Sequence, residues 1–181
     1  MPIVIIGGVT ATGKTCTAKK LANLYHWDYI EADEYHSQAN IDKMQAGVAL
    51  TDEDRLPWLR KLHEQLEKYS SLDQSCIITC SALKKTYRQI LLSGTADPDR
   101  NAKLPTEDFY LIMLTLSRDV LHSRLLARQS EHFMNPNLLD SQLETLELPK
   151  NQEDEPHAYV INCDGLSLDD VIEKIQKIVH Q

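Results

Sequence analysis

The sequence predicts an α/β fold in which helices cover both faces of a parallel sheet. Two observations lead to this prediction: short apolar runs alternate with helical patterns along the chain, and the first run leads into a glycine-rich loop. Continuous apolar runs are typical of parallel strands that are buried on both faces. Alternating β and α elements place ligands at the carboxyl ends of the strands. We therefore expect a functional site where the loops leave the strands.

Five strands are expected, with helical patterns in the intervals between them. The strand candidates are residues 3–7, 29–32, 76–80, 109–116 and 159–163. The helical patterns are a stretch after residue 15, with Ala18, Leu21, Ala22 and Leu24 on one face, and residues 56–69, 82–92, 118–128 and 168–179. Ser167 directly precedes the last helix and is followed three residues later by Asp170, which predicts an N-cap at Ser167. The 181 residues suit a single domain, 1–181, with a core of its own.

The first strand leads into the phosphate-binding motif G-x-x-x-x-G-K-T. The motif comprises Gly8, Val9, Thr10, Ala11, Thr12, Gly13, Lys14 and Thr15, and Cys16 follows it directly. Backbone N–H groups at a helix N-terminus have no intrahelical partners and attract anions, so the motif predicts a seat for polyphosphate. Lys14 is expected to reach the β- and γ-phosphates, and the Thr15 hydroxyl to hold Mg²⁺. The alternative is a glycine turn that matches the motif by chance.

Charge, hydropathy and cysteine content argue against several other classes of protein. Acidic residues outnumber basic ones by 27 to 19, a formal net charge of -8, which disfavours a nucleic-acid-binding surface. No apolar run approaches the roughly 20 residues that span a membrane, and the first strand begins too early for a targeting peptide. We therefore expect a cytoplasmic location. The cysteines Cys16, Cys76, Cys80 and Cys163 form no C-x-x-C pair, which predicts reduced thiols, and Cys16 is interpreted as a helix-packing residue with oxidation as the alternative.

Acidic residues at the end of the second strand are candidates for phosphoryl-transfer chemistry. Glu31 and Asp33 are two apart, and side chains at that spacing on a strand point the same way, here towards the phosphate loop. Asp33 is the candidate base that orients the accepting hydroxyl, whereas Glu31 would lie near the water shell of the metal. His36 is a candidate ligand of a substrate hydroxyl. The alternatives are a helix N-cap at Asp33 and a surface position for His36.

Basic residues recur where an anionic acceptor would bind. Arg55 is one candidate. Lys84 and Arg88, just after the third strand, are four residues apart and are expected to share a helix face. They would either grip an anionic substrate or lie on a solvated helix face, and the spacing alone leaves both open.

Two further arginines precede a candidate lid at residues 129–140. Arg124 and Arg128 are again four apart, and the lid contains Asn-Pro-Asn, which breaks a continuing helix. A guanidinium here would fold over the phosphates and stabilise developing charge. A structural salt bridge is the alternative for either arginine.

Seven segments resemble the thermoresistant type of gluconokinase, a relative of shikimate kinase among the P-loop small-molecule kinases. The segments are GVTATGKT (8–15), ADEYHSQANIDKM (32–44), LTDEDRLPWL (50–59), CSALKKTYR (80–88), SRLLAR (123–128), HFM (132–134) and QLETLELP (142–149). They follow the order of the family along nearly the whole chain. The phosphate loop alone is generic, but ADEYH followed by DRLPWL and CSALKKTYR is specific.

The resemblance implies ATP-dependent phosphorylation of D-gluconate at its 6-hydroxyl, with Mg²⁺ as cofactor. It also implies a P-loop fold with sheet order 2-3-1-4-5, and a homodimer. The implied catalytic residues are Lys14, Asp33, Arg124 and Arg128, and the implied substrate-binding residues are Asp33, His36, Arg55, Lys84, Arg88, His132 and Gln142. The alternatives are a kinase of another small sugar acid and a nucleotide-binding homologue without transferase activity.

Three departures from the family pattern affect the candidate site. Ala11 stands where glycine is usual, so the loop must accommodate a Cβ at a tight point. Glu31 stands where aspartate is usual and provides a longer side chain. The lid sequence ARQSEHFM has one extra residue and no glycine before His132, which leaves the roles of the lid residues open.

Overall fold

The computed structural model describes residues 1–96, 108–127 and 138–180. Its centre is a five-stranded parallel sheet of order β2-β3-β1-β4-β5, which confirms the expected fold class and strand order. The strands are β1 (Ile3–Gly7), β2 (Asp28–Glu31), β3 (Cys76–Thr79), β4 (Phe109–Thr115) and β5 (Ala158–Asn162). Ile3 pairs with both Cys76 and Phe109, so β1 lies in the middle of the sheet.

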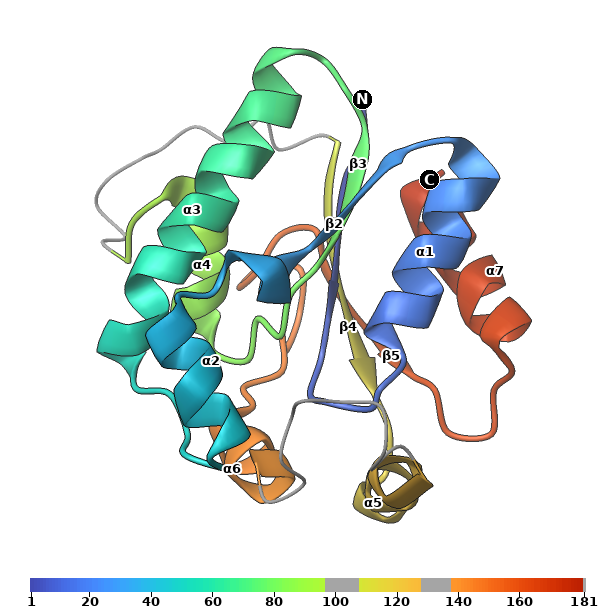
Figure 1. The fold of residues 1–181 in the computed structure, drawn as a ribbon. Coiled ribbons are helices and arrows are strands. Elements are labelled where there is room, and N and C mark those ends of the chain that lie inside the picture. The colour runs from blue at the N-terminus through green and yellow to red at the C-terminus, as the bar shows by residue number, and fades with distance from the viewer. Residues whose placement is uncertain (97–107, 128–137, 181) are drawn as a thin grey trace.

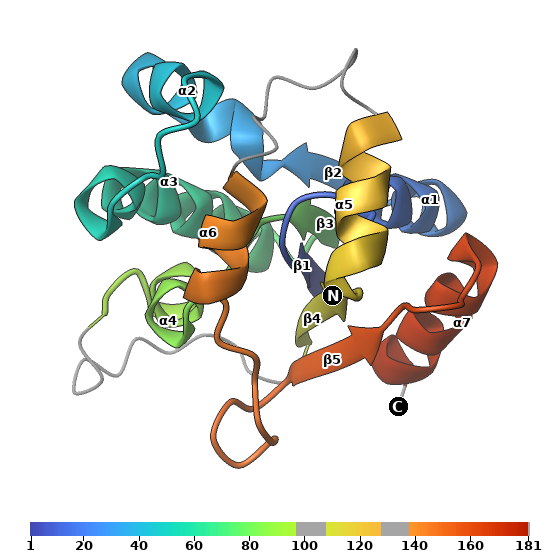
Figure 2. The ribbon, with the colours of Figure 1, turned by 90° about the horizontal axis from the view of Figure 1, so that it is seen from below.

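Helices cover both faces of this sheet (Figure 1). They are α1 (Lys14–Tyr25), the 3-10 helix η1 (Ala32–Tyr35), α2 (Gln38–Gln45), α3 (Asp52–Ser71), α4 (Lys85–Ser93), α5 (Arg118–Ala127), α6 (Leu138–Thr145) and α7 (Leu168–Val179). The long helix α3 lies with α4 on one face, and α1 lies with α7 on the other. Figure 2 shows α2, α5 and α6 around the end of the sheet where the strands finish. These helices therefore surround the end at which a ligand is expected.

The core lies between the sheet and its two helical layers. Strands β1 and β3 are buried along their whole length, as their continuous apolar sequences predict. Leu21 of α1 and Leu62 of α3 belong to this core and are 1% and 0% exposed. None of the helices in the described ranges has both the length and the apolar character needed to cross a membrane.

Capping boxes determine where two of the helices begin. The Thr51 hydroxyl accepts a hydrogen bond from the N–H of Asp54, whose carboxylate accepts one from the N–H of Thr51. This reciprocal pair starts α3 at Asp52, earlier than the apolar pattern predicts. Ser167 and Asp170 form the same motif at α7, which confirms the predicted N-cap.

Two boundaries beside the candidate site differ from the prediction. α4 begins at Lys85 instead of residue 82, because Ala82 has a positive φ of 47° and Lys84 is extended. β2 ends at Glu31, and the backbone then turns into η1. Asp33 therefore lies on a 3-10 turn and not on a strand, so the same-face argument that paired it with Glu31 is wrong.

The buried face of α1 also differs from the expected one. Ala18, Leu21 and Ala22 are buried as predicted, but Leu24 is 52% exposed. Position 25 continues the 3.6-residue period of this face, and Tyr25 packs against the core there. Leu24 lies outside the stripe that faces the sheet.

Candidate active site

The phosphate loop has the backbone conformation that its glycines predict. The loop runs from the end of β1 to the first residue of α1, Lys14. Gly8 and Gly13 have positive φ angles of 133° and 97°. A Cβ on Gly8 would lie 2.5 Å from the carbonyl oxygen of Leu114, so no side chain fits there. Ala11 has a φ of 62°, which shows that the loop accommodates the Cβ that replaces the usual glycine.

In the part of the chain that the structure describes, cationic side chains from α1 and α5 contact the backbone of this loop. Lys14 Nζ donates a hydrogen bond to the carbonyl oxygen of Val9 at 2.8 Å. Arg124 of α5 donates from Nη1 to the carbonyl oxygen of Ala11 at 3.3 Å. Positive charge from α1 and α5 is thus concentrated beside the helix N-terminus, where the predicted phosphates would add negative charge.

A cavity of about 350 Å³ opens beside the loop. Its lining includes most of the loop residues between Thr10 and Cys16, together with side chains that follow β2 and β3 and that begin α3. Asp33, His36 and Arg55 all line it, as does Gln142 of α6. The structure therefore brings together candidates that lie far apart in the sequence.

Glu31 connects the phosphate loop to the second and third strands. Its carboxylate accepts a hydrogen bond from the Thr15 hydroxyl at 3.0 Å, and further hydrogen bonds from the hydroxyls of Tyr29 and Thr79. Burial, followed by the hydrogen bond to Glu31, raises the pKa of Tyr29, so its phenol stays protonated as a donor. The hydroxyls of Tyr29 and Thr79 thus hold the longer carboxylate side chain of Glu31 beside Thr15, the residue expected to bind metal.

His36 lies against the indole of Trp58 in the cavity wall. The two rings are stacked, with centroids 4.2 Å apart and planes at 15°. Burial, and then the nearby positive charge of Arg55, lowers the pKa of His36 to about 4. The imidazole is therefore neutral at pH 7 and is able both to donate and to accept a hydrogen bond. His36 therefore lies in the cavity wall, and the alternative of an ordinary surface histidine is wrong.

Trp58 is a cavity residue to which sequence reasoning gave no role. Its Nε1–H donates to the carbonyl oxygen of Ala32 at 2.7 Å, and its side chain is almost fully buried. In the sequence, the only indication of a role for Trp58 is that this large aromatic residue lies close to the candidate Arg55. Its hydrogen-bond partner, Ala32, lies 26 residues away along the chain. Helical periodicity alone assigns such a residue to the core.

Lys84 and Arg55 differ in how they relate to the cavity. Arg55 lines it, contacts the carbonyl oxygen of Leu50 and lies over the ring of Tyr87 at 5.5 Å. Lys84 does not line it, and its Nζ pairs with both carboxylate oxygens of Asp52 at 2.9 Å. The hydrogen bonds from Tyr87 and then Lys84 lower the pKa of Asp52, so the partner of Lys84 is ionised at neutral pH.

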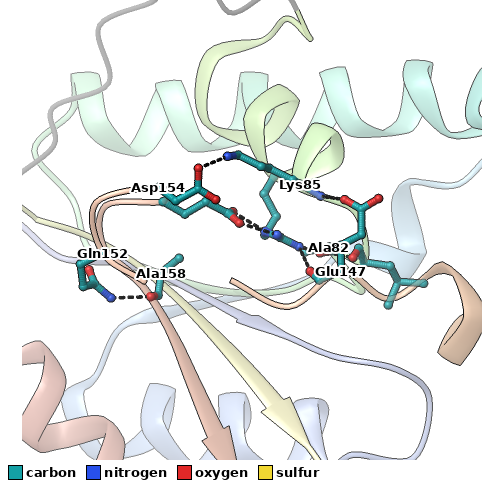
Figure 3. A network of polar contacts seen from close by, with 9 residues as sticks. Ala82, Lys85, Glu147, Gln152, Asp154 and Ala158 are labelled. Carbon is teal, nitrogen blue, oxygen red and sulfur yellow. Dashed lines mark hydrogen bonds and ion pairs between the residues drawn. The ribbon is translucent and has the colours of Figure 1, made fainter. Parts of the chain in front are cut away.

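Arg88 is not brought into the cavity. It is 1% exposed, and its guanidinium forms two hydrogen bonds of 2.6 Å to Glu155. It also donates to the carbonyl oxygens of Ala82 and Glu147 (Figure 3). The expectation that Lys84 and Arg88 share a helix face is wrong, because Lys84 precedes the first residue of α4.

The cysteine predictions have mixed outcomes. Cys76, Cys80 and Cys163 are buried and all four thiols are free, as expected for reduced cysteines. Cys16 is exposed and lines the cavity, so its interpretation as a helix-packing residue is wrong. Arg128, His132 and most of the candidate lid lie outside the described residues, while residues 138–140 of that segment begin α6.

A central strand that ends in a phosphate loop, with a carboxylate and cations across one cavity, defines a P-loop small-molecule kinase. A family model described as an AAA domain matches residues 3–149. The chain is 39% identical to a gluconokinase of Gluconobacter oxydans over 168 residues, covering 93% of this chain and 85% of the relative. It is 35% identical to the thermoresistant gluconokinase of Escherichia coli over 162 residues, covering 90% and 85% of the two chains. A crystal structure of a sugar kinase from Janibacter superposes with a TM-score of 0.84 at 34% identity, covering 99% of this chain and 95% of the other. The chain belongs to the gluconokinase family.

Proposed function

We propose that the protein transfers the γ-phosphoryl group of ATP to the 6-hydroxyl of D-gluconate, giving 6-phospho-D-gluconate and ADP. The observation that carries this proposal is the shared cavity of the phosphate loop, Asp33 and Arg55. A carboxylate beside the phosphate seat suits a reacting hydroxyl, and a cation in the same cavity suits the acid group of the acceptor. The membership of the gluconokinase family supports this pairing.

On the donor side, this chain supplies backbone N–H groups and cations. The N–H groups of the phosphate loop and the N-terminus of α1 bind the phosphates of ATP. Lys14 and Arg124 start from hydrogen bonds to loop carbonyl oxygens and turn to the phosphates when these are present. There they stabilise the charge that develops on the transferred group, which is the main requirement of phosphoryl transfer.

On the acceptor side, Asp33 and Arg55 bind opposite ends of the sugar acid. In an extended gluconate the carboxylate carbon and C6, which bears the reacting hydroxyl, are roughly 6 Å apart, given carbon–carbon bonds of about 1.5 Å. The hydroxyl oxygen forms a bond to the γ-phosphorus while the bond between that phosphorus and the ADP oxygen breaks. Asp33 orients the hydroxyl and accepts its proton, and neutral His36 hydrogen-bonds a further hydroxyl of the acceptor.

The oxygen donors beside the loop fit a magnesium ion. Mg²⁺ prefers hard oxygen ligands and keeps several waters, and the Thr15 hydroxyl and the Glu31 carboxylate are oxygen groups hydrogen-bonded to each other at 3.0 Å. Thr15 would hold the ion, and Glu31 would accept hydrogen bonds from its waters. When bound, the ion neutralises charge on the β- and γ-phosphates.

The test is ADP release with a panel of sugar acids, using the unmodified protein and Asp33→Asn. We expect turnover with D-gluconate and a fall in kcat of at least about a hundredfold in Asp33→Asn, as for loss of a general base. ATP binding should remain, because Asp33 contacts the acceptor. If only a different acid were turned over, that acid and not D-gluconate would be the substrate. Absence of turnover with every acid would indicate a nucleotide-binding homologue. Full kcat in a folded Asp33→Asn would refute the role of Asp33.

A further inference from the structure

Trp58 contacts two parts of the acceptor side at once, and we propose that it is a positioning residue that sets the separation between Asp33 and Arg55. In this way it selects sugar acids by length. The inference rests on the proposed function and adds a determinant of specificity to it. Its basis is the place of Trp58 on α3 and its two contacts with the segment after β2.

The first contact is a hydrogen bond to the turn that carries Asp33. Trp58 Nε1 donates to the carbonyl oxygen of Ala32, the residue directly before Asp33, at 2.7 Å. Trp58 is 3% exposed and Ala32 is 0% exposed, so water cannot easily replace this donor. A buried carbonyl oxygen that loses its partner is costly, so the bond fixes η1 to α3.

The second contact is the stack with His36. The ring planes of Trp58 and His36 differ by only 15°, and Nδ1 of the imidazole lies 3.4 Å from Nδ2 of Asn40. Asn40 in turn donates from Nδ2 to the carbonyl oxygen of Asp54 on α3 at 2.9 Å. His36 is therefore held between α3 and α2, and it keeps a fixed place relative to Trp58.

The position of Arg55 completes the argument. Arg55 and Trp58 are three residues apart on α3, a spacing that places side chains on the same side of a helix, and both line the cavity. One rigid helix thus carries the cation expected at the acid end of the acceptor and holds, through Trp58, the turn that carries the carboxylate at the other end. The separation of Asp33 and Arg55 is set by α3 and by the hydrogen bond from Trp58 to Ala32. An acid of another length therefore contacts only one of these two side chains.

The test compares Trp58→Phe with Trp27→Phe, since the chain has two tryptophans. Phenylalanine keeps a ring to stack on His36 but removes the N–H that holds Ala32. Trp27 packs on Tyr25 between α1 and β2 and does not line the cavity, so it is the matched control. For each variant, kcat and KM are measured for D-gluconate, for a five-carbon aldonate and for ATP, with urea unfolding as a check on folding.

In Trp58→Phe we expect kcat/KM for D-gluconate to fall about tenfold to a hundredfold, the loss typical of a buried hydrogen bond that is left unmade. The preference for D-gluconate over the five-carbon acid should fall as well, while KM for ATP stays within about twofold. A merely structural tryptophan would lower the amount of active protein and leave that preference unchanged. An unchanged preference would overturn the proposal whether or not kcat/KM falls, whereas an inactive parent protein would overturn the proposed function instead.

A second measurement serves if Trp58→Phe does not fold. Trp27→Phe leaves Trp58 as the sole tryptophan, so its emission reports the environment of the acceptor side. Saturating D-gluconate should change that emission in the absence of nucleotide, because the acceptor would contact the stacked pair of Trp58 and His36. Emission that stays constant at a concentration that saturates turnover would overturn the proposal.

Discussion

The side-chain oxygen of Gln142 accepts a hydrogen bond from the backbone N–H of Thr10, with the two heavy atoms 2.7 Å apart. This contact joins α6 to the phosphate loop across 132 residues of sequence. It places an uncharged acceptor within the region that the phosphates of ATP would enter. The charge state of residue 142 is therefore important for nucleotide binding.

Gln142→Glu should weaken ATP binding. Glutamate keeps the size and the acceptor oxygen of the side chain but adds a negative charge beside the loop. Repulsion from the phosphates at an effective dielectric constant near 20 costs about 1–2 kcal/mol, so KM for ATP should rise about tenfold. Steady-state kinetics give the value, and Gln176→Glu on α7 is the control, for which we expect no change. A normal KM for ATP in Gln142→Glu would contradict the placement of the phosphates.

Gly8→Ala should abolish nucleotide binding, whereas Gly165→Ala should not. Both glycines have positive φ, but an added Cβ at Gly8 would lie 2.5 Å from the Leu114 carbonyl oxygen, while at Gly165 it would meet nothing within 4 Å. In Gly165→Ala the only expected effect is backbone strain, which should lower the free energy of unfolding by about 1–2 kcal/mol. Calorimetric titration with ATP and urea unfolding separate the two effects. Equal ATP affinity in both variants would show that the loop adjusts to the side chain.

Arg88→Lys should destabilise the protein without changing recognition of the acceptor. Lysine cannot reproduce the two hydrogen bonds to Glu155, and breaking a buried ion pair costs about 3 kcal/mol. Arg118→Lys is the matched control, because Arg118 and its partner Asp140 are 63% and 61% exposed and such surface pairs contribute less than about 1 kcal/mol. Urea unfolding gives the free energies. A raised KM for D-gluconate in folded Arg88→Lys would return Arg88 to the substrate-binding residues.

Arg55→Leu should raise KM for D-gluconate more than Lys84→Met does. Arg55 lines the cavity, whereas Lys84 is paired with Asp52 outside its lining. Loss of a charge-assisted hydrogen bond to a carboxylate costs about 1.5–3 kcal/mol, so the rise in Arg55→Leu should be at least tenfold. KM for ATP in each variant is the internal control. Equal effects would mean that Lys84 leaves Asp52 to bind the acceptor.

His36 should make the stability of the protein depend on pH between about 6.5 and 4. Its pKa in the folded protein is lowered to about 4, below the ordinary value of 6.5, by burial and by Arg55. The unfolded chain therefore takes up a proton in this range that the folded protein does not, and stability is lost as the pH falls from 6.5 towards 4. His36→Gln lacks this contribution. Urea unfolding at several pH values should show the difference in free energy between parent and variant narrowing below pH 6.5, and a constant difference would contradict the lowered pKa.

The sequence predicts the donor side of the site better than the acceptor side. The phosphate loop is a local motif, in which a few adjacent residues determine both the conformation and the chemistry, so Lys14 and Thr15 could be placed without a structure. Arg88 could not, because its partner Glu155 is 67 residues further along the chain. No pattern of spacing distinguishes a buried arginine with such a partner from one that binds substrate.

Element boundaries account for the errors at Lys84 and Asp33. The predicted pairing of Lys84 with Arg88 assumed a helix from residue 82, but the positive φ of Ala82 delays the first turn. Asp33 reached the cavity as predicted although it lies on η1, because the carboxyl end of β2 points there in either conformation. Sheet order and strand ends thus determine the neighbourhood of a residue, while single turns determine what its side chain meets.

The central place of β1 also governs when a nascent chain becomes able to hold a nucleotide. β1 precedes the other four described strands along the chain, yet its neighbours are β3 and β4, which emerge from the ribosome later. Parallel neighbours cannot be joined by a tight turn, so β1 has no strand partner until β3 (Cys76–Thr79) has emerged. A polypeptide halted before β4 would display the whole phosphate motif and still lack the walls that give it shape.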